Sequence, residues 1–314
     1  MTVVSTPEGH AAPRAVRYVA GVDGGGTGTR ARLQDRDGTL LGQGVAGPSG
    51  LGQGVAQAWR HVMQALDAAF AAAGLPAAAP AHIALGLGLA GAGVAAQRDA
   101  FLRADPGYAL CALDNDGVTQ LLGAHGGGAG VVVAAGTGSV AAASYADGRM
   151  AQAGGWGFPV GDEGSGAWLG LHAMRHTMAV LDGRDAASAL SQALFDHIGS
   201  TAAALLAWCA QAGAPQYAHL APLVFAEAER GDSTAQALLQ AAADELVRLV
   251  DALQKDAPPL PVVASGSVGV RLATLWPPAL RERVVPPEGD SADGALLLVR
   301  AALAATAPPA PPAP

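Results

Sequence analysis

AGVDGGGTGTRARLQDRDG, residues 20–38, places an aspartate directly before a run of small residues. Residues 17–23 alternate loosely between apolar and polar side chains and end at Asp23, which predicts a strand that leads into a tight turn. Residues 30–34 predict a second strand, and the Asp-Gly pair at 37–38 predicts a hairpin turn into a third. A glycine-rich turn alone is a weak signal, so its meaning depends on what the rest of the chain supplies.

The same pattern recurs 110 residues further along the chain. The GTGS at 136–139 aligns with the GTGT at 26–29, and Asp-Gly pairs follow both, at 37–38 and 147–148. We interpret the repeat as the trace of a duplication that gives two similar lobes. Backbone N–H groups in such turns can hold a phosphate, and the Thr and Ser hydroxyls add donors. In a chain rich in Gly and Ala, a chance match is the alternative interpretation.

Short apolar runs elsewhere also end in glycine-rich or acidic turns. They are the predicted strands at residues 83–89, 108–113, 131–135 and 260–264. Helices are predicted at residues 55–73, at 233–254 with Ser233 as the cap, and at 293–305. Because ligands bind at the carboxyl ends of strands in open α/β sheets, we expect a binding site built from several of these turns.

Composition and charge exclude several classes of protein. The 314 residues are 51% hydrophobic and carry a net charge of -8 with no Lys/Arg cluster, which argues against nucleic acid or an anionic membrane as partner. We recognise no signal peptide and no uniformly apolar window of about 18 residues. Cys111 and Cys209 are too few for a disulfide framework or an Fe–S cluster. We therefore expect a cytoplasmic protein.

Five motifs together resemble one family. They are VDGGGTGTRA at 22–31, NDG at 115–117, AAGTGSVA at 134–141, GGWGFPVGDEGSGAWLG at 154–170 and ASGSVG at 264–269. They are similar to motifs of the N-acetylglucosamine kinase-like members of the BadF/BadG/BcrA/BcrD ATPase family, which belongs to the sugar kinase, Hsp70 and actin superfamily. The resemblance covers about residues 18–300, and the motif at 154–170 is its most specific part.

This resemblance implies an α/β fold of two ribonuclease H-like lobes with a nucleotide-binding cleft, the actin-like ATPase fold. We expect a flexible N-terminus at 1–17, one lobe at 18–120, a second at 121–306, and a disordered Pro-rich tail at 307–314.

ATP and Mg²⁺ are the cofactors that the resemblance implies. Asp23 would organise Mg²⁺, through water. The phosphate turns and the adenosine turn would be formed by Gly25, Gly26 and Thr27, by Gly136, Thr137, Gly138 and Ser139, and by Gly266, Ser267 and Val268. Ordinary hairpin and strand-to-helix turns are the structural alternatives. Gly28 stands where many relatives have Lys, which removes a cation that could face the phosphates.

Asp116 is the catalytic base that the resemblance implies. It would orient the sugar hydroxyl and accept its proton during transfer of the γ-phosphoryl group. Asp114, two residues earlier, is the rival candidate, and we prefer Asp116 because Asn115 precedes it and because of its spacing to GTGS. Either aspartate could also cap the helix that follows.

The sugar pocket is assigned by the same resemblance. Its residues would be Gly155, Trp156, Gly157 and Asp162, together with Asp116 and Thr137. A carboxylate such as Asp162 suits sugar recognition because it accepts hydrogen bonds from adjacent hydroxyls. Trp156 could instead fill the core, and Glu163 could hold the loop. Relatives often have Asn near residues 47–50, where this chain has Ser49-Gly50.

We therefore predict an ATP-dependent kinase that phosphorylates N-acetylglucosamine at the 6-hydroxyl, with glucosamine, or a cell-wall sugar such as N-acetylmuramate, as the alternative substrate. The expected partner is a small-molecule sugar, and the resemblance implies a homodimer. The rivals of another class are a redox ATPase activator, which needs cluster-binding cysteines, and a non-catalytic sugar-sensing regulator. His172 and His176 have metal-ligand spacing, but a packed or solvated pair is the favoured interpretation.

Overall fold

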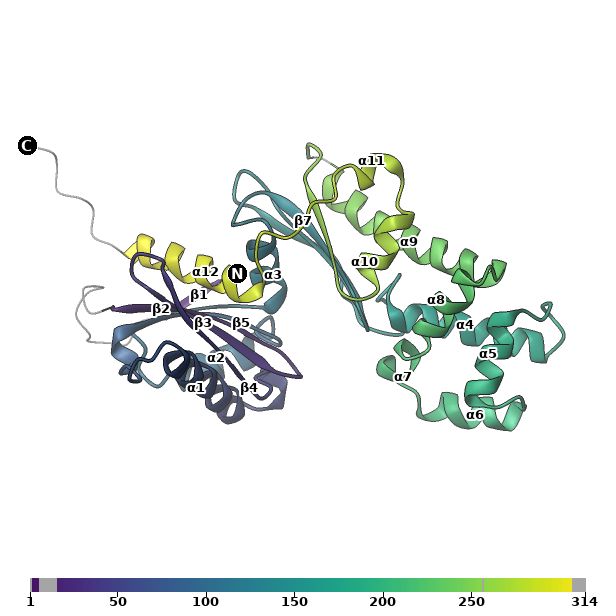
Figure 1. Ribbon diagram of the computed structural model, residues 1–314, viewed down its shortest axis with the longest axis horizontal. Coiled ribbons are helices and arrows are strands. Elements are labelled where there is room, and N and C mark those ends of the chain that lie inside the picture. Colours follow the sequence, from purple (N-terminus) through teal and green to yellow (C-terminus); the bar gives the residue numbers. More distant parts are fainter. Residues whose placement is uncertain (1, 6–15, 256, 307–314) are drawn as a thin grey trace, which may run out of the picture. The chain divides into compact units, whose positions relative to one another are not determined.

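The computed structural model describes residues 2–5, 16–255 and 257–306. They form two compact units (Figure 1). The first unit contains the described residues up to 128 and those from 286 onward, and the second contains the described residues between 129 and 285.

The first unit is built on a six-stranded sheet in the order β1-β6-β5-β2-β3-β4. Its strands are β1 (Val3–Ser5), β2 (Tyr18–Gly24), β3 (Thr29–Asp35), β4 (Leu40–Ala46), β5 (Ile83–Leu89) and β6 (Leu110–Asp114). β2, β3 and β4 form an antiparallel meander, whereas β5 and β6 run parallel to β2. The helices are α1 (Val55–Ala72), α2 (Ala95–Arg103), α3 (Asp116–Ala124) and α12 (Ser291–Thr306), with 3-10 turns at Leu51–Gln53 and Pro80–His82.

Glycines allow helices to pack tightly on both faces of this sheet. A Cβ atom at Gly44 of β4 would collide with the backbone of α1, and one at Gly86 of β5 would collide with the backbone of α12. Large apolar side chains such as Leu33 and Phe70 complete the core on the α1 side. Close backbone contact therefore replaces some of the bulky side chains that this chain, with 4% aromatic residues, lacks.

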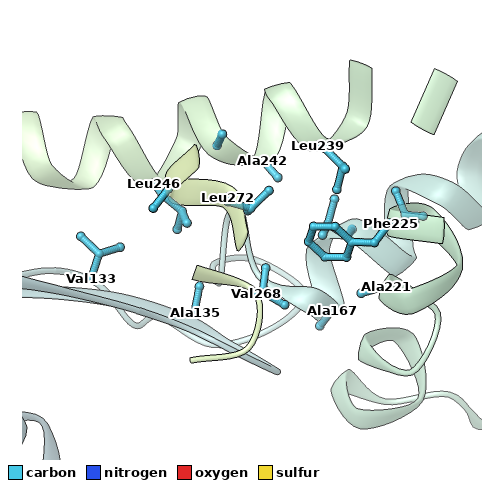
Figure 2. Packing of buried hydrophobic residues seen from close by; sticks show 14 of the residues in the cluster. Val133, Ala135, Ala167, Ala221, Phe225, Leu239, Ala242, Leu246, Val268 and Leu272 are labelled. Atoms are coloured by element: carbon cyan, nitrogen blue, oxygen red, sulfur yellow. The ribbon is translucent and has the colours of Figure 1, made fainter. Parts of the chain in front are cut away.

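The second unit contains a four-stranded sheet in the order β10-β7-β8-β9. Its strands are β7 (Gly130–Ala135), β8 (Ser139–Ser144), β9 (Met150–Gly154) and β10 (Val262–Ser265). Its helices are α4 (Gly166–Leu181), α5 (Ala189–Ile198), α6 (Ala202–Gln211), α7 (Ala214–Ala218), α8 (Ala221–Glu229), α9 (Ser233–Gln254), α10 (Gly269–Leu272) and α11 (Pro278–Arg281), with a 3-10 turn at Ala273–Leu275. Figure 2 shows Leu246 of α9, Leu272 of α10 and Phe225 of α8 in the core of this unit.

The two units repeat one antiparallel meander. β3 and β8 begin at Thr29 and Ser139, and β4 and β9 begin at Leu40 and Met150, so both pairs are separated by 110 residues. In each unit a further strand runs parallel to the first strand of the meander. The repeat in the sequence therefore corresponds to a repeat in the structure, as a duplicated α/β fold requires.

The expected lobe boundaries differ from the observed units. Helix α12 belongs to the first unit because it packs against α3, β2 and β5. The second unit begins at residue 129, after α3, and not at 121. Sequence order hides this arrangement, because the last helix of the chain returns to the sheet built by the first residues.

The expected flexibility of residues 1–17 is wrong for their described part. Val3–Ser5 forms β1, which pairs antiparallel with β6, and Val16 is buried. The rest of that segment, and the Pro-rich tail at 307–314, lie outside the described residues. Helix α9 is capped by Asp232 and not by Ser233, because the Asp232 carboxylate accepts a hydrogen bond from the Ala235 N–H at 2.8 Å.

Among the described residues, no single helix is both long enough and apolar enough to cross a membrane. One bent pair of helices, Ala189–Ile198 and Ala202–Gln211, reaches the required length and apolarity when the two are taken together.

Candidate active site

The turn between β2 and β3 carries glycines that its own packing does not require. The Gly25 N–H donates to the Gly28 carbonyl at 3.0 Å, and the Gly25 carbonyl accepts from the Ser49 and Gly50 N–H groups. A Cβ atom at Gly25 would meet no heavy atom within 4 Å, and Gly25 does not have a positive φ. The open space leaves the backbone accessible to a ligand, as a phosphate-binding turn requires.

Ser49 supports this turn from inside the protein. It is buried, and its hydroxyl shares a hydrogen bond of 2.7 Å with the hydroxyl of Thr29. Gly50 donates its N–H to the turn, as described above. In the described structure these two residues hold the turn between β2 and β3.

Asp23 ends the apolar part of β2, beside the turn. Its carboxylate accepts a hydrogen bond of 2.6 Å from Arg30, its cross-strand neighbour on β3. Carboxylate oxygen is the ligand type that Mg²⁺ prefers, so Asp23 fits the expected role. Among the described residues there is no group of three His, Cys, Asp or Glu side chains that could hold a metal ion.

Asp114 and Asp116 have different surroundings. Asp114 ends β6, is 6% exposed, and accepts hydrogen bonds of 2.8 Å from the Thr2 hydroxyl and from the Asn115 N–H. Asp116 begins α3, and its side chain reaches solvent. Asn115 caps that helix, because its side chain accepts from the Val118 N–H at 2.9 Å. Asp114 is thus occupied within the protein, whereas Asp116 is available to a substrate.

The pKa of Asp116 is raised above the ordinary aspartate value. The first cause is that surrounding protein displaces water from the carboxylate, which disfavours its charged form. The negative charge of Asp23 raises this pKa further, whereas the Gly117 N–H, 3.1 Å from Asp116 Oδ1, lowers it. A base with a raised pKa is closer to the pH at which proton transfer is efficient.

The second turn, between β7 and β8, resembles the first. The Gly136 N–H donates to the Gly138 carbonyl at 2.9 Å, and a Cβ atom at Gly136 would meet no heavy atom within 4 Å. The Gly136 and Thr137 carbonyls accept hydrogen bonds from N–H groups in the first turn of α4. Thr137 is exposed, so its hydroxyl can reach a ligand.

Ser139 differs from the expectation that its hydroxyl faces a phosphate. Ser139 is buried, and its hydroxyl donates to the Glu163 carbonyl at 2.7 Å. Its N–H donates to Asp162 Oδ1 at 3.2 Å. Both donors of Ser139 are used within the protein because this residue begins β8 and packs against the loop before α4.

Asp162 supports the second turn, and its side chain is partly exposed. It has a φ of 61°, unusual for a residue other than glycine, and a Cβ atom at Gly138 would lie within 2.9 Å of its carboxylate. No described residue donates a hydrogen bond to Asp162 Oδ2. One carboxylate oxygen therefore holds the turn at Ser139, and the other is available to a ligand.

Trp156 lies on the surface of the second unit. Its side chain is 85% exposed, so the interpretation of Trp156 as a core residue is wrong. It stands between Gly155 and Gly157, which both have a positive φ, and the Gly155 N–H donates to the Ser139 carbonyl at 3.1 Å. The loop therefore exposes an aromatic side chain directly after β9.

A cavity of about 320 Å³ joins the second turn to the residues after β10. Gly136 and Thr137 line it together with Ser267 and Val268. Gly266 has a φ of 78°, and the Val268 N–H donates to the Ala135 carbonyl at 3.1 Å, which holds this segment against the end of β7. The volume suits a small organic ligand such as a nucleoside.

Helices α7, α8 and α10 supply walls of this cavity that sequence analysis did not identify. They contribute Ala218, Ala221, Pro222, Phe225 and Arg271. Arg271 lies over the Phe225 ring, 3.7 Å from its centroid. These helices carry no binding motif of their own, and the only available signal was the position of Arg271 shortly after the SGS turn.

Both histidines of the pair at 172 and 176 make contacts within the protein. The His172 ring stacks on Trp168 with centroids 3.8 Å apart, and His176 hydrogen-bonds to Ser188 at 2.9 Å. The favoured interpretation of a packed pair therefore agrees with the structure.

The structure thus assembles the predicted residues in two groups. Asp23, the turn at 25–28 and Asp116 belong to the first unit. The turn at 136–139, the loop at 155–162 and the segment at 266–268 belong to the second.

Comparison with known proteins identifies the family. The model of the BadF/BadG/BcrA/BcrD ATPase family matches residues 20–296. A glucosamine kinase from Vibrio cholerae is 31% identical over 283 residues, which cover 90% of this chain and 95% of the relative. An N-acetylmuramic acid/N-acetylglucosamine kinase from Clostridium acetobutylicum is 27% identical over 244 residues, which cover 76% and 79%.

A solved structure gives the same result. It is that of a Chromobacterium violaceum protein considered to be an N-acetylglucosamine kinase, with 48% identity and a TM-score of 0.82 over 91% of this chain and 99% of that one. The protein has the actin-like ATPase fold. The chain belongs to the BadF/BadG/BcrA/BcrD ATPase family.

Proposed function

We propose that this protein is an ATP-dependent amino-sugar kinase that phosphorylates N-acetylglucosamine at its 6-hydroxyl. Its relatives from Vibrio cholerae and Clostridium acetobutylicum are sugar kinases, and the first matches 90% of the chain, so the protein is a sugar kinase. The observation that carries the mechanism is the solvent-accessible carboxylate of Asp116 at the start of α3, with its raised pKa and with Asp23 nearby.

Asp116 would act as the general base. Its carboxylate accepts the proton of the sugar hydroxyl while the sugar oxygen forms a bond to the γ-phosphorus, and the bond from that phosphorus to the bridging oxygen breaks to release ADP. The position of Asp116 at the start of α3 limits the rise in its pKa, because a helix N-terminus stabilises the negative charge of the carboxylate. Bound Mg²⁺ would neutralise charge on the phosphates, and Asp23 is the residue that fits it.

Each unit has its own glycine turn that would contact phosphate, and the second unit also has the cavity described above. A Cβ atom at Gly25 or at Gly136 would meet no heavy atom within 4 Å, so the backbone of each turn is open at that residue, and Gly26 and Thr27 follow Gly25 in the first turn. The adenosine would occupy the cavity lined by Thr137, Ser267 and Val268.

The sugar would bind at the loop that follows β9. Trp156 can pack against an apolar sugar face, and the second carboxylate oxygen of Asp162 can accept a hydrogen bond from a hydroxyl. Gly155 and Gly157 provide the backbone conformation that places Trp156 at the surface.

Glucosamine is the alternative substrate, because the Vibrio cholerae relative is a glucosamine kinase. An amine that carries a proton at neutral pH needs a carboxylate or carbonyl nearby, whereas an acetyl group needs an apolar pocket. Asp162 would serve the amine and Trp156 would contact the acetyl group, and both residues lie between β9 and α4.

Neither rival function is supported. The cysteines do not favour a redox ATPase activator, and Asp116 does not favour a non-catalytic sugar-sensing regulator. Cys111 is fully buried in β6, and burial raises the pKa of its thiol, which opposes the thiolate that an Fe–S cluster requires. Cys209 lies on α6 of the other unit. The exposed carboxylate of Asp116 with its raised pKa favours a catalytic role, which a sugar-sensing regulator without activity does not need.

The deciding experiment measures ADP release from Mg-ATP by the purified protein, alone and with N-acetylglucosamine, glucosamine, N-acetylmannosamine, N-acetylmuramate and glucose. We expect the largest stimulation with N-acetylglucosamine, and coupling between ³¹P and the C6 protons in the product. Stimulation by glucosamine alone would replace the substrate, coupling to the C1 proton would replace the position, and no stimulation by any sugar would contradict the kinase. The homodimer and the cytoplasmic location stay predictions.

A further inference from the structure

Arg30 occupies a particular position beside the first glycine turn. It is the second residue of β3 and lies directly opposite Asp23 on β2. Along β3, Thr29, Ala31 and Leu33 are buried, whereas Arg30 lies on the opposite face and its side chain is 57% exposed. The strand therefore presents the guanidinium next to Asp23 and two residues from the turn.

The guanidinium of Arg30 retains donors that the protein does not use. Its Nη2 donates to Asp23 Oδ2 at 2.6 Å, and its Nη1 lies 3.7 Å from Asp290, beyond hydrogen-bond distance. A guanidinium has five N–H donors, so most of them remain available to a ligand. The neighbouring Arg32 is different, because it is engaged by Asp290 and Asp293 together.

Charge gives a reason for a cation at this point. Asp23 and Asp116 are both acidic, and the charge of Asp23 is felt at Asp116. A nucleotide brings further negative charge to the same end of β2, and the whole chain carries a net charge of -8. A positive side chain at this point would reduce the repulsion between the two carboxylates and the phosphates, in addition to the charge that Mg²⁺ supplies.

Stability alone does not explain the pair. An ion pair between side chains as exposed as Arg30 contributes little to folding, because water screens both charges. The turn at residues 25–28 contains no cation of its own, and Arg30 is a nearby described cation whose charge is only partly used.

We propose that Arg30 is a phosphate-binding residue of the nucleotide site, which contacts the phosphates of ATP and ADP while it keeps Asp23 in position. This inference rests on the proposed kinase function, because that function places a nucleotide at the first turn. It adds a specific residue and a specific charge that the glycine motif does not contain.

Isothermal titration calorimetry with ADP tests this role without any turnover. The variants are Arg30→Met, which keeps the aliphatic length and removes the charge, and Arg30→Lys, which keeps the charge and loses the fork. Arg36→Met is the matched control, because Arg36 is an exposed residue of the same hairpin beyond the far end of β3. Titrations are run with Mg²⁺ and again with EDTA.

Arg30→Met should weaken ADP binding about 10- to 100-fold, as expected for the loss of a charge-assisted hydrogen bond. The loss should persist in EDTA, Arg30→Lys should fall between, and Arg36→Met should match the wild type. The thermal midpoint should be the same for all four proteins, which shows that Arg30→Met is folded.

Three results would overturn the proposal. Arg30→Met could bind ADP as tightly as the wild type, Arg36→Met could lose as much affinity, or the loss could disappear in EDTA, which would limit Arg30 to orienting Asp23 for the metal. If the wild type itself binds no ADP, both this inference and the kinase fail. If ADP binding depends on Arg30 but no sugar stimulates ADP release, the inference stands and the kinase alone is wrong.

Discussion

Two aspartates separated by one residue have different surroundings because a strand ends between them. Asp114 still belongs to β6 and points into hydrogen bonds with Thr2 and Asn115, whereas Asp116 is the first residue of α3 and reaches solvent. Spacing and the preceding Asn115 favoured Asp116 in the sequence. The hydrogen bond from Thr2 to Asp114 could not be predicted, because the two residues are 112 positions apart in the sequence. They meet because β1, which follows Thr2, pairs with β6.

Asp116→Asn should lower kcat by on the order of 10²- to 10⁴-fold, because the amide cannot accept the proton of the sugar hydroxyl. Affinity for ADP should stay the same or rise by calorimetry, since the shape is kept and a negative charge that repels phosphate is lost. Asp114→Asn is the matched control and should keep most of the turnover. A large loss in Asp114→Asn together with normal turnover in Asp116→Asn would identify Asp114 as the base.

The raised pKa of Asp116 predicts a particular pH dependence. The base works only when ionised, so kcat/KM for the sugar should fall as the pH drops through this pKa, above about pH 4, where an ordinary aspartate titrates. The residual rate of Asp116→Asn, which lacks the titrating carboxylate, should not show this fall. If kcat/KM stays level down to about pH 4, either the pKa of Asp116 is not raised in the free enzyme or Asp116 is not the base.

At the scale of elements, strands and turns were easier to predict from the sequence than the roles of the residues within a turn. The strand–turn–strand units at 18–35 and 130–144 follow directly from short apolar runs and Gly-Thr-Gly, since both features are local. The roles within a turn are less local. Ser139 matches Thr29 in the repeat, and both are buried with hydroxyls bonded inside the protein, so the last residue of the motif holds the turn in both units.

Walls built from helices were harder to predict than turns. α7, α8 and α10 line the cavity of the second unit, yet their residues are ordinary core and surface types. Phe225 reads as one apolar residue of a helix, and only its place beside Arg271 and Val268 gives it a role at the cavity. Such a role depends on packing between segments that are far apart in the sequence, and local sequence patterns do not predict that packing.

Glycines of the turns and glycines of the sheet should respond differently to a methyl group. Gly25→Ala places its Cβ in open space, so the thermal midpoint should stay within about 2 °C, whereas ADP affinity should fall because the methyl covers the backbone. Gly86→Ala places its Cβ against the backbone of α12 and should destabilise the fold by about 1–3 kcal/mol or more.

Calorimetric ADP titration and thermal unfolding of both variants check this contrast. Unchanged ADP affinity in Gly25→Ala would show that the first turn does not contact the nucleotide. A stable Gly86→Ala would mean that α12 can shift away from β5.

At the scale of the whole molecule, the chain builds two units and then returns to the first. Duplication was visible in the sequence because the turns and Asp-Gly pairs recur at one offset. The return of α12 was not visible, because an apolar helix at the end of a chain can pack against either sheet. Its specific partners are small residues, Gly21 and Gly86, that accept its backbone, and small residues in this chain are too frequent to serve as a signal.

Because α12 completes the core of the first unit, its loss should affect that unit alone. Leu296 is 4% exposed and packs with Val19, Ala84 and Leu110. Leu296→Ala should destabilise the first unit by about 2–5 kcal/mol. Hydrogen exchange should show faster opening of β2, β5 and β6, with the protection of β7 and β8 unchanged.

Leu206→Ala provides the matched control, because Leu206 is 66% exposed on α6 and its truncation should change stability by less than about 0.5 kcal/mol. Equal loss of protection in both sheets of Leu296→Ala would mean that the two units unfold as one cooperative block. Loss confined to the first sheet would show that the last helix, although it follows the second unit in the chain, belongs to the first unit in its energetics as well as in its contacts.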